Sequence, residues 1–154
     1  MSPTAAKNTV DTLRSVLRAG CLTREDGKRA ERLLENLDRP ARIAAVGHKG
    51  GGKSTILNAL LGENGMPDVT KPTFVELIYG DQFRFAVGDG NNPKVEKNGR
   101  ASDADLPAGC KHIIQQAPLP KLANQSLVEI NLPDSETEKQ QALRWMVENT
   151  DIVI

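Results

Sequence analysis

The nine residues GHKGGGKST, at positions 47–55, decide how the rest of the sequence is interpreted. They combine four glycines with two lysines. The apolar run 43–46 precedes them, and a second apolar segment, 56–61, follows. Glycine gives the backbone access to positive φ angles that other residues avoid, and the lysines place positive charge at the same point. The sequence therefore predicts a loop between a buried strand and a helix.

This loop fits a phosphate-binding pattern. Gly47, Gly52, Lys53 and Ser54 match GxxxxGK[ST] between a predicted strand and a predicted helix. In such a loop the backbone N–H groups and the helix N-terminus point at phosphate oxygens. We predict that Lys53 contacts the β- and γ-phosphates of a nucleoside triphosphate and that Ser54 is a ligand of Mg²⁺. The predicted nucleotide-binding residues are Gly47, His48, Lys49, Gly50, Gly51, Gly52, Lys53, Ser54 and Thr55.

Two positions in the loop have two interpretations. His48 and Lys49 are either solvated loop residues or residues that act near the phosphates. Lys49 stands two positions after Gly47. Partitioning ATPases carry their extra lysine directly after that glycine, so this ATPase class is disfavoured, and an ATPase of another P-loop lineage stays an alternative.

Length and charge limit the remaining function classes. A chain of 154 residues is the size of one domain, for which we expect one core. Twenty basic and twenty acidic side chains cancel, and no block of like charge stands out, which disfavours a nucleic-acid partner. No signal peptide or bilayer-length apolar segment is recognised, so we expect a cytoplasmic, soluble chain. Scattered cysteines and histidines suggest neither a zinc site nor a disulfide, and we expect Cys21 and Cys110 to be buried or idle thiols.

Residues 1–40 are predicted to form an N-terminal helical hairpin, with helices over about 8–19 and from Thr23 to Arg39-Pro40. Its apolar stripes either pack on the rest of the chain or await a helical partner for residues 8–38. The stripe residues at helical spacing are Val10, Leu13, Leu17, Ala30, Leu33, Leu34 and Leu37.

Residues 41–154 alternate between strand and helix patterns. A helix is predicted over 54–61, ending at Gly62, and a hairpin is predicted from strands 74–79 and 83–87. Residues 88–109 are predicted as a loop with one short strand at 94–97. The apolar side of the helix over 54–61 is predicted to consist of Ile56, Leu57, Leu60 and Leu61.

The last third of the chain continues this alternation. Strands are predicted over 111–117 and 126–131, and Ser135 with Glu138 forms a capping-box pattern that opens a helix to about Glu148. A further apolar run begins at Asp151. The inner stripe of the helix is predicted to be Ala142, Leu143, Met146 and Val147. The order of elements predicts an α/β fold of the P-loop NTPase type, with three layers, α/β/α.

Three stretches resemble the dynamin-like branch of the large GTPases, of the bacterial type, over residues 41–154. GHKGGGKSTILNALLG is similar to the phosphate loop and first helix of that group. MPDVTKPTFVELIYG is similar to the segment that carries a switch threonine, for which Thr70 is a better match than Thr73. The resemblance implies that Thr70 joins Ser54 as a Mg²⁺ ligand and that Lys53, Ser54 and Thr70 act in catalysis.

The third stretch, SLVEINLPDSE, departs from the family pattern DTPG. Asn131 takes the place of the aspartate and Asp134 that of the glycine. The neutral amide should weaken metal binding, and a carboxylate facing the nucleotide at 4 Å would cost about 4 kcal/mol at an effective dielectric near 20. Either another carboxylate, Asp134 or Glu136, serves the metal, or hydrolysis is slow.

The resemblance also has implications beyond the site. It implies the N-terminal part of a GTPase domain, incomplete at its C-terminus, because the guanine-specificity motif and the last two strands of the family would follow Ile154. The strand at 151–154 would then be an exposed sheet edge. The implied function is Mg²⁺-dependent hydrolysis of GTP to GDP, with self-association and peripheral membrane association of the full-length protein. The alternative is a regulatory or scaffold module that holds nucleotide without turnover.

Overall fold

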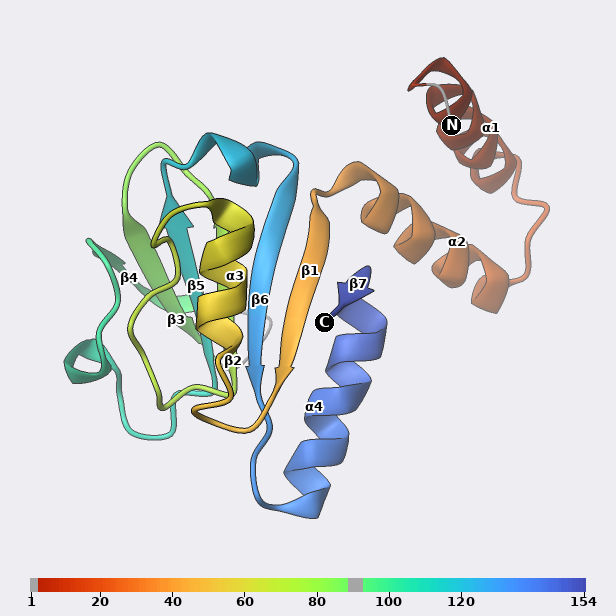
Figure 1. The fold of residues 1–154 in the computed structure, drawn as a ribbon. Helices are drawn as coiled ribbons and strands as arrows, with labels where there is room; N and C mark the ends of the chain where they lie inside the picture. Colours follow the sequence, from red (N-terminus) through yellow and green to blue (C-terminus); the bar gives the residue numbers. More distant parts are fainter. Residues whose placement is uncertain (1–2, 89–92) are drawn as a thin grey trace. The chain divides into compact units, whose positions relative to one another are not determined.

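The computed structural model of the protein describes residues 3–88 and 93–154. The chain divides into two compact units, Met1–Pro40 and Ala41–Ile154, and Figure 1 shows their helices and strands. Whether the first unit is an independent domain stays a prediction.

The first unit consists of two helices that contact each other, α1 (Pro3–Arg18) and α2 (Arg24–Asp38). Both predicted helices are confirmed. Thr23 caps α2, because its side-chain oxygen accepts a hydrogen bond from the Asp26 N–H at 3.2 Å. This contact satisfies one of the N–H groups that the first turn of a helix leaves unpaired.

The apolar stripe of α2 is only partly buried. Leu34 is half-buried, whereas Leu33 and Leu37 are 51% and 60% exposed. Isolated exposed leucines are ordinary, but these two lie four residues apart on one side of a helix. A helical partner for this stripe stays a prediction.

The second unit is built on a mixed sheet with the strand order β4-β3-β5-β2-β6-β1-β7 among the described residues (Figure 1). β6 is parallel to β1 and antiparallel to β2, and β2 is parallel to β5. The remaining pairs are parallel β1–β7, antiparallel β3–β5 and antiparallel β3–β4. The strands are β1 (Ala41–Gly47), β2 (Phe74–Tyr79), β3 (Arg84–Gly88), β4 (Pro93–Asn98), β5 (His112–Ala117), β6 (Gln125–Asn131) and β7 (Ile152–Val153).

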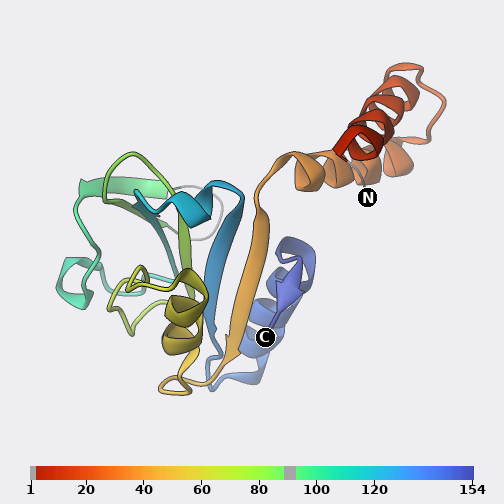
Figure 2. The ribbon, with the colours of Figure 1, turned by 45° about the horizontal axis from the view of Figure 1, so that its top comes forward.

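Helices cover both faces of this sheet, so the predicted three-layer α/β/α arrangement is confirmed. α3 (Lys53–Leu61) packs on one face through the buried Leu57 and Leu61. α4 (Glu136–Asn149) packs on the other face through the buried Ala142. Figure 2 shows the two helices on opposite sides of the sheet. Full burial of a leucine side chain is worth about 1.5–3 kcal/mol, so α3 is anchored firmly beside the loop that precedes it.

The predicted hairpin between residues 74–79 and 83–87 is wrong. β5 lies between β2 and β3 and is parallel to β2. A Cβ on Gly80 would lie only 2.7 Å from the Cβ of Gln116 in β5, so a glycine lets the chain pass close to that strand. The hairpin is instead formed by β3 and β4, and β4 contains the predicted strand 94–97. β5 takes the inner position because its Ile113 and Gln115 are fully buried there.

Two details of α4 also differ from expectation. The Ser135 side chain makes no capping hydrogen bond, and the side chain of Glu138, the other half of the predicted capping box, pairs with Lys111 at 2.9 Å. Val147 is 76% exposed, and Trp145 packs inward in its place, with its ring centroid 4.5 Å from that of Phe74. The inward face of α4 therefore runs through positions 142, 145 and 146, which is i, i+3 and i+4 spacing.

The apolar side of α3 is likewise divided. Leu57 and Leu61 are buried, but Ile56 and Leu60 are 50% and 47% exposed. α3 contacts the sheet along one line of residues spaced four apart, and the adjacent line faces outward.

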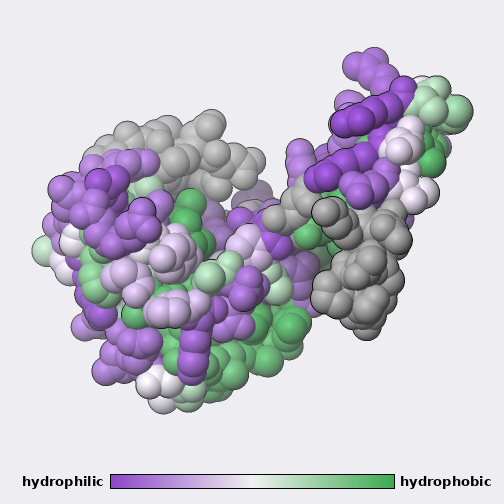
Figure 3. All heavy atoms as spheres, turned by 90° about the horizontal axis from the view of Figure 1, so that it is seen from above, coloured by the Kyte–Doolittle hydropathy of each residue, from purple (hydrophilic) through white to green (hydrophobic). Residues whose placement is uncertain are grey.

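β7 forms one end of the sheet, as the sequence predicted for an exposed edge. Its residues Ile152 and Val153, together with Ile154, are about half exposed. Hydrophobic residues gather on part of the surface of this unit among hydrophilic ones (Figure 3). Within the described residues, no helix has the length and apolar character needed to span a bilayer.

Candidate phosphate-binding site

The glycine-rich loop connects the end of β1 at Gly47 to the start of α3 at Lys53. Gly50 and Gly52 adopt φ angles of 75° and 77°, in the left-handed region where other residues are strained. Gly52 is the N-cap of α3 and offers no side chain. The first N–H groups of α3 therefore face the loop without a capping side chain over them, which is the arrangement that binds anions.

Lys53 is buried inside this loop, with 5% of its surface exposed. Its Nζ donates to the backbone oxygen of His48 at 2.6 Å, and the same oxygen accepts from the Gly51 N–H at 3.3 Å. Nζ also lies 3.8 Å from Oε1 of Glu129. A buried ammonium requires such partners, and they hold the lysine across the loop.

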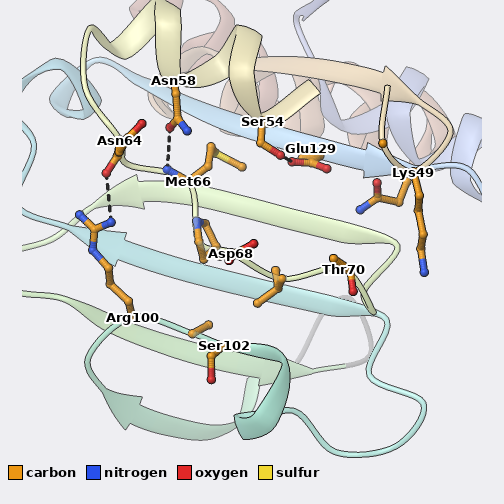
Figure 4. A pocket seen from close by; sticks show the side chains of 15 residues that line it. Lys49, Ser54, Asn58, Asn64, Met66, Asp68, Thr70, Arg100, Ser102 and Glu129 are labelled. Carbon is orange, nitrogen blue, oxygen red and sulfur yellow. Dashed lines mark hydrogen bonds between the residues drawn. The ribbon is translucent and has the colours of Figure 1, made fainter. Parts of the chain in front are cut away.

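Ser54 makes the second polar contact of the site. Its hydroxyl donates to Oε2 of Glu129 at 2.5 Å, and Figure 4 shows the two side chains, from α3 and β6, pointing toward each other. Glu129 is buried. The sequence prediction missed Glu129, although alternate residues of a strand face the same side and it stands two residues before Asn131.

Asn131, at the position of the family's aspartate, has a different contact. Its Nδ2 donates to the backbone oxygen of Pro72 at 3.1 Å, and its backbone N–H donates to the oxygen of Thr73 at 2.8 Å. Next to it, the Leu132 N–H donates to the oxygen of Gly47 at 3.0 Å. The end of β6 thus hydrogen-bonds both to the segment before β2 and to the start of the glycine-rich loop.

Thr70, the predicted switch threonine, contacts the turn at residues 103–105. Its hydroxyl donates to Oδ2 of Asp103 at 2.6 Å, and its N–H donates to Oδ1 at 2.9 Å. These hydrogen bonds from Thr70 lower the pKa of Asp103 below its ordinary value. The role of Thr70 as a Mg²⁺ ligand stays a prediction, and it requires the hydroxyl to turn from Asp103.

The two carboxylates suggested as replacements for the aspartate have different positions. Asp134 is exposed and lines a cavity with His48 and Lys49. Glu136 is in the first turn of α4, where its Oε2 lies 3.7 Å from Nζ of Lys139. The carboxylate that the structure places on Ser54 is Glu129.

Two cavities lie beside the loop. One, of about 630 Å³, brings Lys49, Gly50 and Ser54 together with Thr70 and Glu129 (Figure 4). The other, of about 430 Å³, is lined by residues that include His48, Lys49 and Asp134. Thr55, the last predicted nucleotide-binding residue, instead lines a separate hollow on α3. Of the predicted loop residues, His48, Lys49, Gly50 and Ser54 line these two cavities, and the binding of nucleotide by the loop stays a prediction.

The donor set at the loop fits a magnesium ion that is bound together with phosphate. Within the described residues, no three His, Cys, Asp or Glu side chains form a metal-binding group. Mg²⁺ in nucleotide sites takes only one or two protein oxygens, with phosphates and water supplying the rest. The Ser54 hydroxyl and the Glu129 carboxylate are hard oxygen donors of this kind.

No protein-family model and no curated protein match this sequence. Among solved structures, the chain is similar to an oligomerised bacterial dynamin pair, which is described as providing a mechanism for the long-range sensing and tethering of membranes. The identity is 20% over 84% of this chain, and the TM-score is 0.55. A second structure of such a pair has 24% identity over 82% of this chain and a TM-score of 0.54. The chain spans 22% of the length of each. The likeness to dynamins is confirmed at the level of the fold, which does not by itself establish an activity.

Proposed function

We propose that residues 41–154 form the nucleotide-binding part of a GTPase module, in which the loop 47–55 holds the phosphates of GTP or GDP together with Mg²⁺. The observation that carries this proposal is the position of three groups at the mouth of α3. The buried Glu129 carboxylate accepts from the Ser54 hydroxyl and lies 3.8 Å from the Lys53 ammonium, and Ser54 and Glu129 line a cavity of about 630 Å³ beside the loop.

Each residue then has a defined task. Lys53 exchanges the neutral carbonyl of His48 for phosphate oxygens, which form charge-assisted hydrogen bonds roughly twice as strong. The N–H groups at the start of α3 add the positive end of the helix dipole. Ser54 would be a ligand of Mg²⁺, and the ion would neutralise charge on the β- and γ-phosphates. In hydrolysis, water attacks the γ-phosphorus and the bond to the bridging oxygen breaks, which gives GDP and orthophosphate.

A second candidate function is a regulatory module that holds nucleotide without turnover. It is supported by Asn131, whose amide is occupied by Pro72, and by Thr70, whose hydroxyl is occupied by Asp103. Both positions contribute to magnesium and γ-phosphate contacts in the resembling family, so a chain that uses them for other contacts is expected to hydrolyse slowly.

Guanine rather than adenine as the base is proposed from the resemblance, and an ATPase of another P-loop lineage is the alternative. Self-association and peripheral membrane association of a cytoplasmic protein are proposed because the similar structures are oligomerised and tether membranes. Sedimentation velocity with and without a non-hydrolysable GTP analogue tests self-association, and co-sedimentation with anionic lipid vesicles tests membrane association.

The decisive experiment is a titration of the chain with a fluorescent GTP analogue in MgCl₂, followed by a phosphate-release assay with GTP. Binding with steady phosphate release supports the GTPase module, and binding without release supports the regulatory module. Competition by unlabelled ATP and GTP in the same titration identifies the base. If neither nucleotide binds, both candidate functions are wrong.

A further inference from the structure

β6 carries two polar side chains toward the phosphate loop. Leu127 belongs to the core under α3, whereas Val128 and Ile130 belong to the core under α4. Because alternate residues of a strand face the same side, Glu129 and Asn131 lie on the α3 face with Leu127. Glu129 therefore points to the same layer as Asn131 but stands about 6.6 Å further back along the strand, at roughly 3.3 Å per residue.

Asn131 cannot support Mg²⁺ as the aspartate at this position does in the dynamin-like GTPases. Its amide donates to Pro72 at 3.1 Å, and the side chain is buried, with 4% exposed. A buried amide that loses its partner costs about 1–3 kcal/mol. The amide is also neutral, so it adds no negative charge to a cation site.

Glu129 stands further from the loop along β6 than Asn131, but its longer side chain and the small residue paired with it on β1 let its carboxylate reach the start of α3. Its side chain is one methylene longer than that of aspartate, and its partner in the register of β1 is Ala45, whose small side chain lies in the same core layer. The carboxylate thereby reaches the start of α3, where Oε2 accepts from Ser54 and Oε1 lies near Lys53.

The Glu129 carboxylate needs a new positive partner once phosphate is bound. Glu129 is 7% exposed, and a buried carboxylate costs several kcal/mol unless a cation compensates it. Without nucleotide, Lys53 is that cation. When Lys53 turns to the phosphates, Glu129 is left beside further negative charge, and a divalent cation is what restores the balance. The Ser54 hydrogen is already donated to Glu129, so the lone pairs of Oγ remain for the cation.

We propose that Glu129 supplies, from two residues upstream, the carboxylate of the magnesium site that Asn131 cannot supply. Glu129 orients the Ser54 hydroxyl and compensates the charge of the ion, so it is a positioning residue. Asn131 has the separate task of fastening the segment before β2. This inference rests on the proposed binding of nucleotide at the loop.

The test is a set of titrations of the 154-residue chain with a fluorescent GTP analogue and with inorganic tripolyphosphate as competitor, each in MgCl₂ and in EDTA. Mg²⁺ should tighten binding by the wild-type chain. Glu129→Gln should lose about 10- to 100-fold of affinity in MgCl₂, the usual effect of removing a group that supports a metal ligand, and little in EDTA. Asn131→Asp restores the carboxylate of the family pattern, and in the fraction that stays folded it should not increase the effect of Mg²⁺.

The outcomes separate this inference from the proposed function. If the wild-type chain binds neither probe in either condition, the proposed function and this inference both fail. If it binds and Glu129→Gln keeps the full effect of Mg²⁺, or if Asn131→Asp enhances that effect, the inference alone is overturned. Glu129→Asp is a second variant that keeps the charge and the fold but withdraws the carboxylate by about 1.5 Å, and it should show a partial loss. Circular dichroism and thermal unfolding verify the fold of each variant.

Discussion

Thr70 and Asp103 form a two-point contact that holds the segment before β2 against the turn at residues 103–105. The Thr70 hydroxyl donates to one carboxylate oxygen at 2.6 Å and the Thr70 N–H donates to the other at 2.9 Å. The backbone oxygen of Asp103 also accepts from Lys71 Nζ at 2.7 Å. In the proposed function, this contact competes with the nucleotide for Thr70.

Replacing Asp103 by alanine should loosen the segment 69–73. Both carboxylate hydrogen bonds to Thr70 disappear, so its N–H loses its acceptor. Amide hydrogen exchange followed by mass spectrometry should show faster exchange in peptides that cover residues 69–73. Asp105→Ala is the control, because Asp105 lies in the same turn but accepts a hydrogen bond from the Ser102 hydroxyl, at 2.6 Å, rather than from Thr70. Unchanged exchange in Asp103→Ala would show that the contact does not hold the segment.

The same contact should persist in mild acid. Hydrogen bonds from Thr70 lower the pKa of Asp103 below its ordinary value of 3.8. A group with a lowered pKa in the folded state stabilises the fold fully above its unfolded pKa, and the effect is lost as the pH falls through the folded value. The chemical shift of the Thr70 amide should therefore stay constant from pH 7 to about pH 4 and change only below it. A midpoint above pH 4 would contradict the assigned cause.

Lys53→Ala should abolish tight binding of triphosphate. A hydrogen bond to a charged group contributes about 1.5–3 kcal/mol, so the loss of affinity should be at least about tenfold. The fluorescent GTP titration measures it. Lys49→Ala is the control, because Lys49 is an exposed lysine of the same loop and its removal should have a smaller effect. Equal losses in both variants would point to general charge attraction and against the assigned role of Lys53.

Asn131→Asp should destabilise the fold. The substitution replaces a donor by an acceptor that faces the Pro72 oxygen, so a buried hydrogen bond of 3.1 Å is lost. The expected decrease in the free energy of unfolding is about 1–3 kcal/mol, measured by urea denaturation. Asn124→Asp, at an exposed position before β6, should leave the stability nearly unchanged. An equal effect in both variants would contradict the role given to the Asn131 amide.

Arg42→Met should destabilise the opposite side of the sheet. Arg42 Nε donates to Oε1 of the buried Glu76 at 2.8 Å, and His112 lies 3.7 Å from the other oxygen. Burial raises the pKa of Glu76, but the contacts with His112 and Arg42 outweigh it and leave the pKa below its ordinary value of 4.5. Removing one partner of a buried ion pair costs about 3 kcal/mol or more.

The loss of stability in Arg42→Met should be largest near neutral pH. Since the folded pKa of Glu76 is lowered, its stabilisation is complete above pH 4.5 and is lost as the pH falls further. Urea denaturation at pH 7 and at pH 4 should therefore show a smaller difference between wild type and Arg42→Met at the lower pH. Arg144→Met, at an exposed position on α4, should change neither value.

Local signals in the sequence placed most of the elements. The cap at Thr23, the glycine loop before α3 and the apolar runs of β5 and β6 lie where the pattern predicted them. These signals act over a few residues, so they can be recognised in the sequence without knowledge of the fold. The error at β2 and β3 has the same origin, because two neighbouring apolar runs resemble a hairpin locally, and only the burial of β5 places a third strand between them.

The sequence by itself determined the glycine-rich loop before α3, since the glycines at positions 50 and 52 and the charge of Lys53 are properties of the residues. Only the tertiary structure decided which carboxylate lies beside it. Glu129 reaches Ser54 because β6 and β1 pair in a register that sets it against Ala45, and Asn131 is occupied because Pro72 approaches it from a distant segment. Contacts between segments so far apart depend on strand register and packing, which no local pattern encodes.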